Sequence, residues 1–252
     1  VNRLLCSERV IVSDQPGTTR DSIDVPFVLS GGGKERHYLL TDTAGIRKRG
    51  KINRTVERFS MSRALRSIAR SDVTALVLDA AQGPTAQDKT IARMILDHHK
   101  GCLLLVNKWD LLAKSASEQE YGEALYRAVP FLRFAPAVFI SAQTGFNIRR
   151  ALTAMERVSN QINLCLPTGA LNRALTRAYD RVQPPLVQGK RLKFYYAVQT
   201  DVQPIRVLLF VNDPARLVRA YEDYLIHALR EEFGLEGAPV VLQLKSHRAL
   251  EK

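Results

Sequence analysis

Apolar residues along this chain gather in short runs of strand length, with segments of helical spacing between them. Predominantly apolar runs at residues 73–78, 103–106 and 137–140 indicate buried strands. Residues 87–99 carry apolar side chains three or four positions apart, which is typical of a helix with one buried face. Strands that alternate with helices predict βαβ units, so we expect an α/β fold with a mainly parallel sheet.

A different order of elements follows residue 165. Pro167 disfavours a helix through residues 164–167, so this stretch is expected to be a short linker. Beyond it the pattern predicts the order α-β-β-α-β, which packs as a three-stranded sheet with two helices on one face. We therefore expect two domains, residues 1–165 and 166–252. The expected elements of the second are a helix at 168–181, strands at 191–200 and 205–212, a helix at 214–233 and a strand at 240–244.

The apolar run at residues 103–106 ends abruptly in Asn107, Lys108 and Asp110. Side chains at the carboxyl end of a parallel strand lie where ligands bind in open α/β sheets. A carboxylate accepts two hydrogen bonds, which suits the ring N–H and amino group of guanine but nothing on adenine. Asn107 can bridge a ligand and neighbouring loops, and the stem of Lys108 can lie along a base. An isolated N-K-x-D also fits a strand that runs into a polar turn, so its weight depends on other motifs.

A second polar strand end is expected after residues 38–41. Asp42 can hold Mg²⁺ through water, because this ion keeps several waters and takes few protein carboxylates. Gly45 lets the backbone approach a terminal phosphate and donate its N–H. This D-x-x-G follows a strand and precedes N-K-x-D, an order that favours a nucleotide site over an ordinary turn.

Two shorter signals lie at either end of this set. The turn at Pro16-Gly17 is followed by the hydroxyls of Thr18 and Thr19, which can reach a metal or a phosphate. Ser141 and Ala142 follow the third buried strand, where backbone N–H groups can donate to the carbonyl oxygen of guanine. Each signal alone fits an ordinary loop, and only their order along the chain gives them weight.

The composition indicates the kind of partner and the redox environment of the protein. The chain of 252 residues has a formal net charge of +12, which favours a polyanionic partner such as nucleic acid. The basic residues 47–51 are either a solvated loop or a contact for a phosphate-rich partner. Three well-separated cysteines without metal spacing suit a reducing, cytoplasmic setting. No apolar run approaches the roughly 20 residues that span a bilayer, and no signal peptide is expected.

With these residues collected, the chain resembles the EngA/Der family of ribosome-assembly GTPases. The resemblance extends along essentially the whole chain and matches the second of that family's two G domains and its C-terminal KH-like domain. It implies a P-loop NTPase-type G domain followed by a KH-like domain. The segments that carry it are 16–21 (P-G-T-T-R-D), 42–47 (D-T-A-G-I-R), 107–110 (N-K-W-D) and 141–142 (S-A), with 184–187 and 210–214 in the tail.

The resemblance implies a role for each matched position. Thr19 would bind Mg²⁺ in the GTP state, with Thr18 as the other candidate, and Asp42 would hold the same ion through water. Gly45 would contact the γ-phosphate. The implied cofactors are GTP or GDP and Mg²⁺, and the implied partners are the large ribosomal subunit and its RNA. The implied guanine-reading residues are Asn107, Lys108, Asp110, Ser141 and Ala142.

Two departures from the expected pattern matter. The phosphate-binding loop G-x-x-x-x-G-K-[ST] is missing from the sequence and would lie just before Val1. We therefore expect residues 1–5 to be the end of a helix and the chain to be a fragment that binds GTP poorly, with the first G domain upstream. Ile46 occupies the position of the water-orienting glutamine of many small GTPases. Hydrolysis would then need another group, a partner or a bound monovalent cation, and no catalytic base is assigned.

Two other functions stay open. One is a non-hydrolysing RNA- or protein-binding module with an incomplete nucleotide pocket, which the complete base-reading and Mg²⁺ motifs argue against. The other is a GTPase of tRNA modification, which the KH-like tail argues against.

The tail holds two features that resemble RNA-binding devices. Residues 234–237 spell the G-x-x-G of KH loops, but Glu236 repels phosphate and glycine is common after a helix. We therefore expect an ordinary turn there. Phe194 and Tyr196 are expected to share one face of their strand as core residues, with Tyr195 on the other face.

Overall fold

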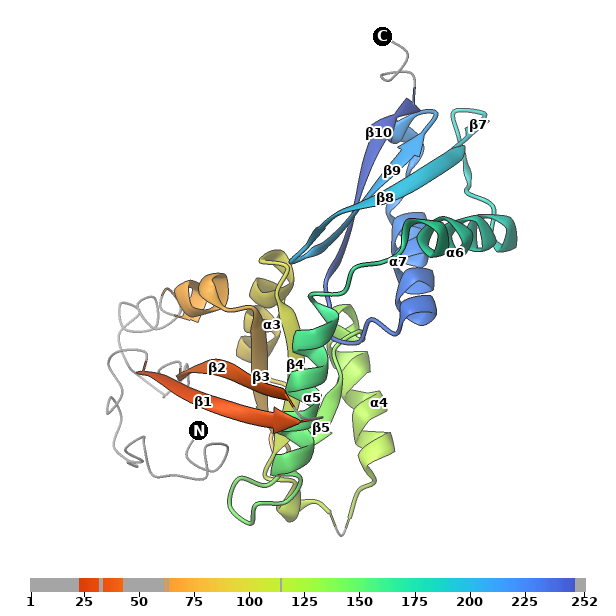
Figure 1. Ribbon diagram of the computed structural model, residues 1–252. Coiled ribbons are helices and arrows are strands. Elements are labelled where there is room, and N and C mark those ends of the chain that lie inside the picture. The colour runs from red at the N-terminus through yellow and green to blue at the C-terminus, as the bar shows by residue number, and fades with distance from the viewer. Residues whose placement is uncertain (1–22, 32–33, 43–61, 63, 114, 248–252) are drawn as a thin grey trace.

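The computed structural model describes residues 23–31, 34–42, 62, 64–113 and 115–247 (Figure 1). A parallel sheet with helices on both faces is followed by a second, three-stranded sheet with two helices on one face, which confirms the predicted fold class. No helix in the described part is long and apolar enough to cross a bilayer. The first group of elements is β1 (Ile23–Gly31), β2 (Lys34–Asp42), β3 (Val73–Asp79), α3 (Ala86–Asp97), β4 (Gly101–Asn107), η1 (Trp109–Leu111), α4 (Glu118–Ala128), η2 (Pro130–Leu132), β5 (Ala137–Phe139) and α5 (Ile148–Gln161). The second group is α6 (Thr168–Arg181), β6 (Leu186–Val187), β7 (Lys190–Arg191), β8 (Phe194–Val202), β9 (Ile205–Val211), η3 (Pro214–Arg216), α7 (Arg219–Phe233) and β10 (Val240–Ser246).

Strand β4 lies at the centre of the parallel sheet, whose order is β3-β4-β5. Its first six residues are all buried, because both faces of the strand are covered. Leu104 and Val106 pack with residues of α3 and α4, whereas Leu103 and Leu105 pack with residues of α5. Each such leucine contributes about 2 kcal/mol by leaving water. The uniform apolar run therefore results from a strand between two helical layers.

Strands β1 and β2 form a separate antiparallel hairpin. Phe27 and Tyr38 stack across it with ring centroids 5.3 Å apart. Arg70, in the helical segment that precedes β3, lies 2.6 Å from the Asp24 carboxylate and connects the hairpin to that segment. Within the described residues, β3 pairs with β4 alone, and Val77 of β3 is 54% exposed.

The second sheet has the order β10-β9-β8, with β10 parallel and β8 antiparallel to β9. Helices α6 and α7 cover one of its faces (Figure 1). The main elements follow the predicted order α-β-β-α-β, with a short β6-β7 hairpin added after α6. The strand expected from residue 191 begins at Phe194, and α7 begins at Arg219 rather than at Pro214. Asp213 accepts a hydrogen bond from the backbone N–H of Ala215, and this capped turn forms η3 before the helix starts.

A β-bulge in β8 corrects one expectation. Phe194 pairs with Val211, but the next pair is Tyr196 with Phe210, so Tyr195 is an extra residue in the ladder. One extra residue reverses the alternation of faces. Phe194 accordingly packs against the helix-covered core, whereas Tyr196 stacks on Phe210 on the other face. The prediction that Phe194 and Tyr196 share a face is wrong.

The turn at residues 234–237 packs against the first group of elements. The N–H of Gly237 donates to the carbonyl of Phe134 at 2.6 Å, and its carbonyl accepts from the N–H of Cys102 at 2.9 Å. Gly237 has φ +72°, and an added Cβ would lie 2.6 Å from a Val158 methyl group and 2.7 Å from the Cys102 oxygen. Only glycine fits this contact. Arg157 lies 3.5 Å from Glu236, so the acidic residue of the turn also contacts α5.

Candidate nucleotide-binding site

The polar residues that follow β3, β4 and β5 meet at one edge of the parallel sheet. Asp79 at the end of β3 is the register partner of Asn107 at the end of β4. Phe139, the last residue of β5, is the partner of Val106. The loop after β5 is thereby brought beside Asn107, at the edge where open α/β sheets bind ligands.

Asn107 joins this edge to its neighbours on both sides. Its side-chain oxygen accepts a hydrogen bond from the N–H of Ala142 at 2.9 Å. Its carbonyl accepts from the N–H of Ala80 at 2.8 Å. Within the described residues, its amide nitrogen has no acceptor, so this donor is available to a ligand.

Lys108 has a left-handed backbone conformation, with φ at 64°. A non-glycine residue in this region costs about 1 kcal/mol or more, which is typical of functional positions. Its ammonium nitrogen lies 2.6 Å from Oδ2 of Asp79, and its side chain is 45% exposed. The backbone turn and the ion pair together fix the aliphatic stem along the sheet edge.

The Asp79 carboxylate is nearly buried but ionised. Burial raises the pKa of Asp79, but the Lys108 ammonium and neighbouring backbone N–H groups lower it by more, so this pKa lies below its ordinary value. One of these groups is the N–H of Ala81, which donates to Oδ1 at 3.0 Å. The negative charge that holds Lys108 is therefore present at neutral pH.

Trp109 anchors the short helix η1 that presents Asp110. The indole is 3% exposed and lies against the rings of Tyr121 and Phe139, at centroid distances of 5.5 and 4.6 Å. The N–H of Trp109 donates to the carbonyl of Ile140 at 3.1 Å. Because Trp109 is fixed on the inside, Asp110 is held at the surface with its carboxylate exposed.

The loop after β5 is stabilised by its own hydrogen bonds. Ser141 is fully buried, and its hydroxyl oxygen accepts from the N–H of Thr144 at 3.1 Å. The N–H of Ser141 donates to the carbonyl of Phe146 at 3.2 Å. The two backbone donors that we expected to face a ligand, those of Ser141 and Ala142, thus both donate within the protein. Ser141 and Ala142 therefore stabilise the conformation of this loop.

Three supporting residues were missed from the sequence. Asp79 holds Lys108, Tyr121 donates its hydroxyl to the carbonyl of Ala80 at 2.9 Å, and Asn147 donates to the carbonyl of Phe139 at 3.0 Å. Asp79 had a usable signal, because a carboxylate ends its strand as an amide ends the next one. Tyr121 bonds to a residue far away in sequence, Asn147 bonds across the loop after β5, and neither has a local signal in the sequence.

The phosphate and metal side of the predicted site is not described. Thr18, Thr19 and Gly45 lie outside the described residues. Asp42 is the last residue of β2, where its backbone pairs with Ile23. The structure thus brings together Asn107, Lys108, Asp110, Ser141 and Ala142, and the roles of these and of the remaining residues stay predictions.

Comparison with solved structures shows which known proteins share the fold of this chain. The fold is similar to that of Era from Aquifex aeolicus bound to GDP and tetrafluoroaluminate, with a TM-score of 0.52 over 97% of this chain and 87% of that chain. The two sequences are 18% identical, so this likeness concerns the fold. A second structure of Era, in complex with a nucleotide analogue and a segment of 16S ribosomal RNA, has a TM-score of 0.50. These likenesses show the fold, an α/β domain with a parallel sheet followed by a three-stranded domain with two helices on one face.

Sequence comparison identifies the family. Residues 166–245 match the C-terminal KH-like domain of EngA bacterial GTPases, and residues 1–108 match the 50S ribosome-binding GTPase family. GTPase Der of Caldanaerobacter subterraneus is 44% identical over 97% of this chain and 55% of its own length. GTPase Der of Syntrophotalea carbinolica is 41% identical over 100% of this chain and 56% of its own length. The chain belongs to the EngA/Der family, and it spans just over half the length of these relatives.

Proposed function

We propose that this chain provides the second G domain (residues 1–165) and the KH-like domain (residues 166–252) of a GTP-hydrolysing switch protein. The switch acts in assembly of the large ribosomal subunit through contacts with ribosomal RNA. The observation that carries the proposal is the sheet edge where Asn107, Lys108 and Asp110 lie beside the loop after β5. Membership of the EngA/Der family supports guanine nucleotides as the ligands.

Guanine recognition follows from the chemistry of this edge. The exposed carboxylate of Asp110 accepts from the ring N–H and the amino group of guanine. The stem of Lys108, fixed by Asp79, lies along the base face. The amide nitrogen of Asn107 donates to the ligand while its oxygen holds Ala142. Ser141 and Ala142 keep the neighbouring loop in shape.

The phosphates and Mg²⁺ are assigned to residues outside the described edge. Thr19, or alternatively Thr18, would bind Mg²⁺, Asp42 would hold it through water, and Gly45 would contact the γ-phosphate. A bound Mg²⁺ would neutralise phosphate charge during hydrolysis. Ile46 has no polar atom with which to orient water, so the catalytic group comes from elsewhere in the protein, from a partner or from a monovalent cation.

The partner proposed is the large ribosomal subunit and its RNA, which implies a cytoplasmic location. The family match to 50S ribosome-binding GTPases and the net charge of +12 support it. The rival proposals are a non-hydrolysing RNA- or protein-binding module and a GTPase of tRNA modification. Both make different predictions for the experiments below.

Base recognition can be tested without the β- and γ-phosphates. Trp109 is the only tryptophan and follows Lys108 directly, so its fluorescence reports on the edge. Titration of the chain with GMP at millimolar concentration should change this fluorescence, and AMP should have a much weaker effect. Asp110→Asn should weaken GMP binding about tenfold and favour XMP, because its amide can donate to the carbonyl that replaces the amino group. Equal responses to GMP and AMP would contradict the assignment of the edge.

The ribosomal partner needs a separate experiment. Purified large and small subunits are sedimented with the chain, with transfer RNA as a competitor. We expect retention on the large subunit. Because this chain is expected to bind GTP poorly, the comparison with and without nucleotide is made on the complete protein, and retention of that protein that is the same in both conditions favours a binding module. Competition by transfer RNA favours the tRNA-modification alternative.

A further inference from the structure

The uncovered face of the second sheet carries a cluster of aromatic rings. Tyr196 of β8 stacks on Phe210 of β9, with centroids 4.2 Å apart and an interplanar angle of 14°. Phe210 is only 6% exposed, although it lies on the face opposite to α6 and α7. The stacked pair therefore forms a rigid apolar base on a face that no helix of the described residues covers.

The β-bulge adds an exposed ring to this base. Tyr195, the extra residue of the ladder, is 49% exposed. Its ring lies 4.6 Å from that of His247, centroid to centroid, and His247 also contacts Tyr196 edge-on at 6.3 Å. The rings of β8, β9 and the residue after β10 thus form one continuous patch, with Tyr195 open to solvent.

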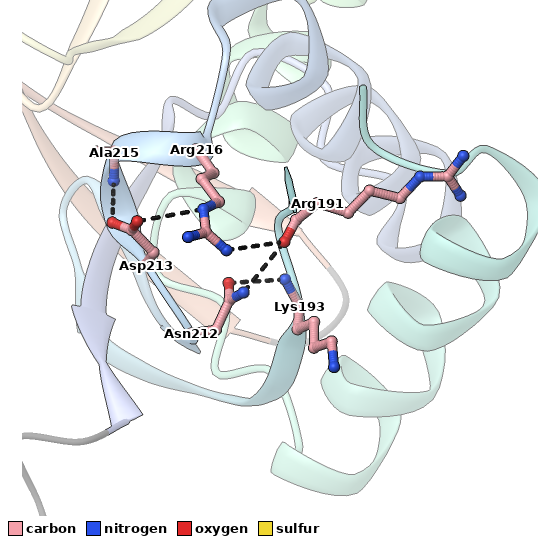
Figure 2. Close-up of polar contacts among 6 residues, drawn as sticks. All are labelled: Arg191, Lys193, Asn212, Asp213, Ala215 and Arg216. Atoms are coloured by element: carbon pink, nitrogen blue, oxygen red, sulfur yellow. Dashed lines mark hydrogen bonds and ion pairs between the residues drawn. The ribbon is translucent and has the colours of Figure 1, made fainter. Parts of the chain in front are cut away.

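Basic side chains flank the aromatic rings. Lys245 of β10 is exposed and is the register partner of Phe210, so it lies in the same row across the sheet as the stacked pair. Lys193 precedes Tyr195 by two residues, and its backbone N–H donates to the side-chain oxygen of Asn212 at 2.8 Å. Figure 2 shows its ammonium extending away from that network. Within the described residues, neither lysine has an acidic partner.

The nearby carboxylate of Asp213 is already neutralised. Arg216 lies 3.2 Å from Asp213 and also donates to the carbonyl of Arg191 at 3.4 Å (Figure 2). Asp213 therefore does not cancel the charges of Lys193 and Lys245. The face combines an open aromatic ring with two unpaired positive charges, which is the combination that binds single-stranded nucleic acid.

The G-x-x-G turn does not offer an alternative site for phosphate. The backbone of Gly237 is bonded to Phe134 and Cys102, and Glu236 lies against Arg157. Bound in this way, the turn cannot clamp a nucleic-acid backbone. If the second sheet and its helices bind nucleic acid, they must therefore do so through a surface other than this turn.

We propose that the aromatic face formed by Lys193, Tyr195, Tyr196, Phe210, Lys245 and His247 binds a single-stranded segment of nucleic acid. A base stacks on Tyr195, and the adjoining phosphates contact Lys193 and Lys245. Single strands fit because a duplex keeps the faces of its bases stacked inside. The inference rests on the proposed function in one respect, the identity of the nucleic acid as ribosomal RNA.

Fluorescence anisotropy with a labelled, mixed-sequence single-stranded RNA of about 12 nucleotides tests the proposal. An RNA duplex and a single-stranded DNA of the same length are measured alongside it. Tyr195→Ala should weaken binding of the single strand about tenfold, and Tyr195→Phe should bind like the wild type because the ring is kept. Lys245→Gln should weaken binding a few-fold and reduce the salt slope by about 0.7. Arg181→Gln, an exposed cation on α6, is the matched control and should change affinity less than about twofold.

Each outcome of this experiment has one meaning. If the wild-type chain binds none of the three probes, both this inference and the RNA part of the proposed function fail. If Tyr195→Ala and Lys245→Gln bind RNA like the wild type, the assigned face is wrong while RNA binding stands. A preference for the duplex would also overturn the inference. Tighter binding of DNA than RNA would support the assigned face but contradict ribosomal RNA as its ligand.

If the variants bind RNA normally but no longer sediment with the large subunit, the face binds a protein. Thermal melting of every variant excludes loss of folding as the cause.

Discussion

The side-chain oxygen of Asn107 lies 2.9 Å from the backbone nitrogen of Ala142, which joins the end of β4 to the loop after β5. Asn107→Ala removes this acceptor and should lower the free energy of unfolding by about 1 kcal/mol. Asn107→Asp keeps an acceptor and should retain most of the stability. Urea denaturation followed by Trp109 fluorescence measures both. Equal losses in the two variants would show that the hydrogen bond is not the cause.

The ion pair between Asp79 and Lys108 should be measurable by a double-mutant cycle. We expect Asp79→Asn and Lys108→Met, made separately and together, to give a coupling free energy of about 1 kcal/mol, because one partner is nearly buried and the other is half-exposed. The measurement is urea unfolding at neutral pH. A coupling of zero would mean that the pair does not stabilise the sheet edge.

The same pair should make stability depend on pH in the acid range. The pKa of Asp79 is lowered in the folded protein from an unfolded value of 3.8. Its stabilisation is therefore complete above pH 3.8 and is lost as the pH falls through the lower folded-state pKa. Relative to Asp79→Asn, the wild-type protein should progressively lose its advantage in urea midpoint only as the pH falls below 3.8. An advantage that is already lost well above pH 3.8 would contradict the lowered pKa.

Substitution of two glycines with the same backbone angle can distinguish the cost of backbone strain from the cost of a steric clash. Gly237 and Gly189 both have φ +72°, but only an added Cβ at Gly237 meets other atoms within 4 Å. Gly189→Ala should cost about 1 kcal/mol for the backbone alone. Gly237→Ala should cost about 2 kcal/mol more, because Val158 and Cys102 must move. Differential scanning calorimetry of the two variants checks this, and equal losses would exclude a tight contact at Gly237.

The thiols of Cys102 and Cys165 should differ strongly in reactivity. Cys102 is fully buried, and burial raises the pKa of its thiol to about 12. Cys165 is exposed. Iodoacetamide at pH 8 should label Cys165 in the folded protein and Cys102 only in denaturant, as read by peptide mass mapping. Labelling of Cys102 under native conditions would show that the contact with Gly237 opens.

The sequence alone allowed much of the site to be predicted. The apolar run before Asn107 predicted a doubly covered strand, and the polar residues after it predicted a ligand-binding edge. The first prediction succeeds because burial on both faces leaves a local trace in residue type, whereas ligand binding at this edge stays a prediction. The family motifs added the order of the nucleotide-contacting segments.

Other features depended on partners distant in sequence. The bulge at Tyr195 arises from pairing with β9, and no alternation within β8 reveals where an extra residue enters. Glu236 already favoured an ordinary turn over a phosphate clamp at residues 234–237, but only the tertiary structure showed that Phe134 and Cys102 bond to the backbone of Gly237. The local sequence pattern determined which segments are buried strands and which polar residues lie at their ends. The tertiary structure decided which polar groups meet, because hydrogen bonds and ion pairs join atoms that the fold alone brings within reach.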